Sequence, residues 1–223
     1  MLATANARTR AFICVVRKIA VIIETGPKRT FASALDWPGW ARSGRGDEAA
    51  LQALAAYRDR YAEAIGQPVG DDVFEVIERV QGDATTDMGA PGAKGAIDAK
   101  PLSDKELRRQ IAILDACWSA FDRALKRGAG HTLRPGARGG GRNLEKIRAH
   151  VLEAHGAYQT AVAGPAGAKD RSTFVEALWA RHRGELPESG PRGGRRWTAR
   201  YAIRRSAWHL LDHAWEIEDR LDA

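Results

Sequence analysis

Residues 103–125 read SDKELRRQIAILDACWSAFDRAL, and this stretch decides the main architecture of the chain. Its apolar residues recur at alternating steps of four and three, which places them along one side of an α-helix. This apolar seam consists of Leu107, Ile111, Leu114, Trp118, Phe121 and Leu125. Ser103 and Glu106 match a capping box at the start of the helix. The stretch therefore predicts a long amphipathic helix that packs against other helices.

Three further segments show helical spacing on the C-terminal side. One follows a capping residue, Asn143, and runs to about residue 158, and another opens at Ser172. The last covers residues 197–221, with its apolar positions at Ile203, Ala207, Leu210, Ala214, Ile217 and Leu221. Two glycine-rich, basic loops separate these segments. Four amphipathic helices predict a helical bundle over residues 103–223.

The N-terminal side has strand signals instead. Residues 18–24 (KIAVIIE) are apolar and β-branched, and residues 29–36 alternate after a turn, so together they predict a β-hairpin. Residues 41–44 allow a short third strand. Asp47 is placed to cap a helix that runs to about Ile65, and residues 73–80 alternate as a further strand.

These patterns predict an α+β chain with two modules. A small α/β module covers residues 17–82, and the four-helix bundle covers residues 103–223. Residues 83–102 are rich in glycine, alanine and aspartate without a sustained period, and they are predicted to form a linker or long loop.

The composition of the chain says more about its cellular compartment than about its function. The two cysteines, Cys14 and Cys117, lie far apart, which favours a reducing compartment over a disulfide scaffold. The apolar run at residues 11–16 is too short for a secretion signal, and no run approaches the roughly 20 residues that span a bilayer. A cytoplasmic protein without a membrane anchor is expected. The net charge of +7 fits either a solvated arginine-rich surface or a nucleic-acid-binding face.

His209 and His213 are the residues with the clearest chemical potential. They stand four apart in the last helix, so both imidazoles lie on one face and can bind the same metal ion. Leu210 occupies the position where a zinc protease has glutamate, so that class of site is excluded. From spacing alone, structural histidines with hydrogen-bonded rings are the commoner explanation.

A metal would need a ligand from a second helix. Residues 149–155 offer His150 and His155, and helical geometry alone does not choose between them. Glu153 and Glu216 are further candidates.

Residues 204–220 (RRSAWHLLDHAWEIEDR) resemble the last helix of the DinB-like proteins, and residues 149–154 are similar to the second helix of that family. The resemblance implies a four-helix bundle in which His150, His209 and His213 hold a divalent metal such as Zn, Ni or Fe. It further implies a thiol-dependent transferase whose metal activates a low-molecular-weight thiol cofactor, such as mycothiol or bacillithiol, toward a small-molecule substrate.

The N-terminal module resembles HicB-like antitoxins. The resemblance rests on residues 18–24, the hairpin, the D-x-P-G turn at residues 36–39 and the helix start near Asp47. It implies an accessory module of that fold. It also supports an alternative function, a non-enzymatic regulatory or nucleic-acid-associated protein with a nucleic acid or a toxin as its partner.

Trp208 and Trp215 are seven residues apart on a face of the last helix away from the Ile203 seam. This second apolar stripe is expected to contact the first module or a second copy of the chain in a homodimer. Packing within the bundle is the equally simple alternative.

Overall fold

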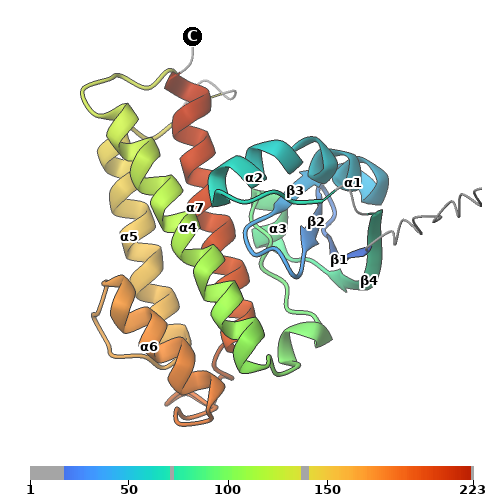
Figure 1. Cartoon of the computed structure of the whole chain (residues 1–223), viewed down its shortest axis with the longest axis vertical. Helices are drawn as coiled ribbons and strands as arrows, with labels where there is room; N and C mark the ends of the chain where they lie inside the picture. Colours follow the sequence, from blue (N-terminus) through green and yellow to red (C-terminus); the bar gives the residue numbers. More distant parts are fainter. Residues whose placement is uncertain (1–17, 71–72, 137–140, 222–223) are drawn as a thin grey trace, which may run out of the picture.

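The computed structural model describes residues 18–70, 73–136 and 141–221 (Figure 1). The chain is α+β, with a four-stranded sheet in its N-terminal part and helices after it, as predicted. Cys14 and the apolar run at residues 11–16 lie outside the described residues. In the described part of the chain, no helix combines the length and the hydrophobicity that crossing a bilayer requires.

The sheet has the strand order β3-β2-β1-β4. Its strands are β1 (Lys18–Thr25), β2 (Thr30–Ala34), β3 (Ala41–Gly44) and β4 (Val73–Gln81). β1 pairs antiparallel with β2 and parallel with β4, so the connection from β3 to β4 crosses over the sheet. The predicted hairpin, third strand and final strand are therefore confirmed.

The crossover contains two helices, α1 (Gly46–Ala56) and α2 (Arg58–Ile65), where a single capped helix was predicted. The break at Tyr57 lets this ring pack 5.2 Å from Trp215. The predicted cap was also wrong, because Asp47 already lies inside the first turn of α1. Its carboxylate instead accepts a hydrogen bond from Arg79 at 3.0 Å.

The helices of the C-terminal part are α4 (Asp104–Gly128), α5 (Leu144–Ala161), α6 (Arg171–His182) and α7 (Ala199–Leu221). The predicted caps of the first two are confirmed. The Ser103 hydroxyl accepts from the amide of Glu106, and the Asn143 side chain accepts from the amide of Lys146. α6 begins at Arg171 and is capped by Asp170, so the predicted start at Ser172 was one residue late.

α7 is buried on nearly all sides because it packs on both parts of the chain (Figure 1). Its Ile203 side faces the bundle, where α7 runs along α4 and α5. On the other side, Trp208 lies 6.3 Å from Phe31 and Trp215 packs on Tyr57. The second apolar stripe therefore contacts the first module, one of the two predicted partners.

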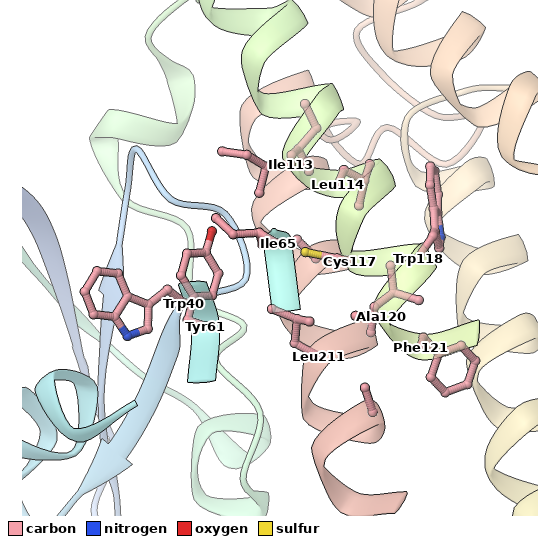
Figure 2. Close-up of a cluster of buried hydrophobic side chains, with 14 of the residues drawn as sticks. Trp40, Tyr61, Ile65, Ile113, Leu114, Cys117, Trp118, Ala120, Phe121 and Leu211 are labelled. Atoms are coloured by element: carbon pink, nitrogen blue, oxygen red, sulfur yellow. The ribbon is translucent and has the colours of Figure 1, made fainter. Parts of the chain in front are cut away.

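The sheet module and the bundle share one continuous core (Figure 2). Trp40 is fully buried, stacks on Tyr61 at 5.4 Å and donates its indole N–H to the carbonyl of Leu54. Cys117 of α4 belongs to the same cluster, and burial raises the pKa of its thiol. Cys117 is thus an inert packing residue.

Residues 83–102 are more ordered than predicted. Within the predicted linker or long loop they contain α3 (Ala84–Met88) and the 3-10 turn η1 (Ala96–Ala99), two short elements that the sequence did not indicate. The buried carboxylate of Glu24 in β1 accepts hydrogen bonds from the amides of Gly92 and Ala93, both at 3.0 Å. These hydrogen bonds give the backbone amides of the segment acceptors on the sheet. A polar segment without apolar periodicity can therefore still be held against the sheet.

Candidate metal centre

Two helices bring the predicted histidines together. His150 lies in α5, while His209 and His213 lie on successive turns of α7. The Nε2 atom of His209 is 3.1 Å from that of His150 and 3.1 Å from that of His213. The three imidazoles each offer one ring nitrogen within 4.8 Å of the other two. They form the three-histidine cluster.

Protons alone cannot satisfy this cluster. A neutral imidazole nitrogen carries either a proton or one in-plane lone pair, so it donates or accepts but does not do both. His209 Nε2 faces two other Nε2 atoms at hydrogen-bonding distance, and only one of those contacts can be a good hydrogen bond. A cation differs, because it attracts all three lone pairs at once.

The spacing of the nitrogens fits a small transition-metal ion. Zn–N bonds of about 2.0–2.1 Å in tetrahedral geometry put neighbouring nitrogens roughly 3.3 Å apart. The two observed distances of 3.1 Å are close to that value. Among the described residues, the cluster contains no fourth side-chain ligand. Three protein ligands leave one coordination position open, which is typical of catalytic metal sites rather than structural ones.

Glu216 orients the ring of His213. Its Oε2 atom lies 2.7 Å from His213 Nδ1, and its Oε1 accepts from Arg220 at 2.9 Å. Burial acts to raise the pKa of Glu216, but the bond to His213 and the nearby positive charges outweigh it and the net pKa is lowered. The ionised carboxylate accepts a hydrogen bond from Nδ1–H, which keeps the proton on Nδ1 and leaves the Nε2 lone pair for a metal.

We expect Glu216→Gln to weaken metal binding by about 10- to 100-fold, since it removes the negative charge that fixes the His213 tautomer. The measurement is a Zn²⁺ titration by calorimetry. Glu153→Gln, an exposed residue of α5, is the matched control. Equal affinities of Glu216→Gln and wild type would contradict the orienting role.

Two of the three candidate ligands, His150 and His209, are held neutral by their surroundings. Burial lowers the pKa of His209 to about 2, with further lowering by the charges of His213 and Arg205. Burial and the neighbouring His213 also lower the pKa of His150. At neutral pH these rings therefore present lone pairs rather than protons, the form that binds metals.

His155, the competing candidate, points elsewhere. Its ring is buried between Trp118, at 5.5 Å, and Phe174, at 4.9 Å. In the described part of the chain its Nε2 has no hydrogen-bond partner. Five residues in a helix turn the side chain well away from His150, so the two cannot share a ligand role. The structure groups His150, and not His155, with His209 and His213.

His155 should make the protein less stable in mild acid. Burial lowers its pKa in the folded state, so below about pH 6.5 the unfolded chain takes up a proton that the folded chain does not. The stability that depends on neutral His155 is fully present above the pKa that His155 has in the unfolded chain, and it is lost as the pH falls below that pKa. Between pH 7.5 and 5.5, urea unfolding of wild type should lose about 1 kcal/mol relative to His155→Phe. A pH-independent difference would contradict this.

Sequence reasoning missed the residues around the ligands. Glu216 was a candidate ligand, whereas the structure places it behind His213. The signal was present, because Glu216 and Arg220 follow His213 at helical spacings of three and seven. Tyr158, 5.9 Å from His209, was not recognised as a neighbour of the site. Arg205 was, together with Arg204, a sequence-based candidate for holding a carboxylate of a thiol ligand, and its guanidinium lies 4.6 Å from the Trp208 ring.

Comparison of the chain with models of protein families, with curated proteins and with solved structures gives no match. The three-histidine cluster is therefore interpreted from its own geometry.

Proposed function

We propose that the chain binds one divalent transition metal at His150, His209 and His213 and acts as a metal-dependent enzyme on a small-molecule substrate. The convergence of three Nε2 atoms from two helices carries this proposal. When bound, the metal supplies a Lewis acid with an open position. Glu216 holds His213 in the binding tautomer, and burial lowers the pKa of His209 and of His150, so these two imidazoles are unprotonated at neutral pH.

Arg205 is the residue best placed to hold an anionic group near the site. It stands one turn before His209, and its Nη1 is buried without a hydrogen-bond partner among the described residues. Its charge contributes to the lowered pKa of His209. Arg204, the other candidate for this role, is occupied by the carboxylate of Asp98 at 2.6 Å. A carboxylate or phosphate of the substrate would give this Nη1 atom an acceptor.

The resemblance to DinB-like proteins favours a low-molecular-weight thiol as the cofactor and a thiol-dependent transfer as the reaction. A positive centre favours the thiolate over the thiol, and the thiolate is the nucleophilic form. This part of the proposal depends on the motif at residues 204–220.

The first experiment is elemental analysis of protein purified without chelators or an affinity metal. One Zn, Ni or Fe per chain is expected, and the metal-free protein should take up one Zn²⁺ in a titration. Addition of a thiol to Co²⁺-loaded protein should then add a sulfur-to-metal charge-transfer band. His131→Ala, an exposed histidine outside the cluster, is the control that should change nothing. Protein that neither contains nor takes up a metal would refute the proposal.

The regulatory alternative has narrower support. It depends on the HicB-like resemblance and the net charge of +7. The face of the module that contains Phe31 and Tyr57 packs on α7, so a toxin partner would have to use another face.

A further inference from the structure

α7 begins next to the end of α6, at one end of the bundle (Figure 1). A cavity lies among the residues of this region. It has a volume of about 570 Å³ and is lined by Lys94, Gly95 and residues 98–102, by the end of α6, by Gly184, Leu186 and Glu188, and by residues 195–201. None of the three clustered histidines lines it. Its volume lies within the range of sites for small molecules.

The wall of this cavity is strongly basic. Six cationic residues line it: Lys94, Lys100, Arg181, Arg195, Arg196 and Arg200. The lining carboxylates are Asp98 and Glu188, and Asp98 is already neutralised by Arg204. In the described structure, none of the six cations forms an ion pair with a carboxylate. Glu188 acts electrostatically on Arg181 and Glu106 on Arg200, but neither forms an ion pair with them in the part of the chain that the structure describes, so the lining of the cavity keeps an excess of positive charge.

Two of the arginines are fixed in place by neutral groups. Arg181 donates to the carbonyls of Val162 and Pro187, both at 2.8 Å. Arg196 donates through Nη1 to the carbonyl of Thr160 at 2.7 Å, while its Nε is buried without a partner among the described residues. Burial and the charge of Arg196 lower the pKa of Arg181. Carbonyls position these guanidinium groups but do not cancel their charge.

An aromatic pair lies among the cations. Trp197 is half-buried, and its ring lies 4.7 Å from Tyr201 in an edge-to-face arrangement. Tyr158 packs behind Trp197 at 5.1 Å and fixes its orientation. The ammonium of Lys94 lies 5.2 Å from the Tyr201 ring and 5.9 Å from the Trp197 ring. An indole beside an excess of positive charge suits a ligand that has both a planar ring and negative charge.

The first turn of α7 adds to the positive electrostatic potential of the cavity. Thr198, Ala199 and Arg200 line the cavity, so the positive end of a 23-residue helix faces it. The Thr198 hydroxyl accepts from the amide of Tyr201 at 3.3 Å and so caps the start of this helix.

We propose that this cavity binds a small anion that carries a planar ring and phosphate groups, the class to which nucleoside phosphates belong. The cations and the start of α7 hold the phosphates, and Trp197 stacks on the ring. This site is independent of the proposed metal centre, although Tyr158 contacts both Trp197 and His209.

ADP is the probe for this site, with adenosine and pyrophosphate as its two halves. Calorimetry should give one ADP per chain, and each half should bind at least about tenfold more weakly, because each lacks one set of contacts. The double variant Lys94→Gln/Arg200→Gln should weaken ADP binding at least about tenfold. The matched control, Lys146→Gln/Arg148→Gln, removes the same charge from the exposed face of α5 and should bind as wild type does.

His209→Ala separates this proposal from the metal centre. It should bind ADP as wild type does, whether or not the chain binds metal. Loss of ADP binding in that variant would place the ligand at the histidines and overturn the proposal. No saturable ADP binding, or equal binding of pyrophosphate and ADP, would also overturn it. Tighter binding of a short oligouridylate, with a steep salt dependence, would replace the small ligand with a nucleic acid.

Discussion

Replacing His209 with alanine should lower the affinity of the chain for Zn²⁺ by about 100- to 1000-fold. Zinc sites with four ligands are worth about 10–16 kcal/mol, so one ligand contributes roughly 3–4 kcal/mol. His209 Nε2 is also the atom that both other rings approach at 3.1 Å, so its loss opens the centre of the cluster. The measurement is a competition titration against a chromophoric chelator at neutral pH.

Two variants make this result specific. His150→Ala removes the ligand from α5 and should have an effect of the same order. His155→Phe keeps an aromatic ring against Trp118 and Phe174 and should leave Zn²⁺ affinity unchanged. Far-UV circular dichroism of each metal-free variant confirms that it is folded. If His155→Phe lost the metal while His150→Ala kept it, the assignment of the third ligand would be wrong.

The largest loss of stability is expected from Arg204→Met. Arg204 donates to both carboxylate oxygens of Asp98, at 3.1 and 2.6 Å, and the two side chains are only 7% and 4% exposed. Removing one partner of such a pair leaves a buried charge without a counter-ion, which costs about 3–5 kcal/mol. Urea unfolding monitored by tryptophan fluorescence measures this loss.

The double variant Asp98→Asn/Arg204→Met tests the cause. It removes both charges but keeps an acceptor for the amide of Gly95, so at least half of the lost stability should return. Arg171→Met breaks an ion pair of the same 2.6 Å length whose side chains are 42% and 52% exposed, and it should cost less than about 1 kcal/mol. A similar cost for the two single variants would show that burial does not govern the Arg204 effect.

Much of the architecture could be predicted because its signals are periodic. The seam of α4, the capping box at Ser103 and the alternation in β4 each depend on neighbouring residues alone. The order within residues 83–102 could not be predicted, because it depends on Glu24, about 60–70 residues away in the chain. Long-range hydrogen bonds to backbone amides leave no pattern in the segment that receives them.

In the candidate site, too, some features could be predicted from the sequence and others could not. The spacing of His209 and His213 identifies two histidines on one face, but a single helix cannot show which residue of a neighbouring helix lies opposite. His150 and His155 have similar angles to the α5 seam, and packing decides between them. The aromatic pocket of Trp118 and Phe174 takes His155, which leaves His150 to face α7.

α7 carries two of the histidines and also packs on the sheet module. Binding of a metal to these histidines is therefore expected to raise the free energy of unfolding of the sheet module as well as that of the bundle. Any ligand that binds only the folded state raises the free energy of unfolding of every part that unfolds together with its site. Trp208 and Trp215 connect α7 to Phe31 and Tyr57 through the shared core. Amide hydrogen exchange in β1 and β2 should therefore slow when Zn²⁺ is added. The exchange rate of these strands would then respond to metal bound at histidines that lie outside the sheet.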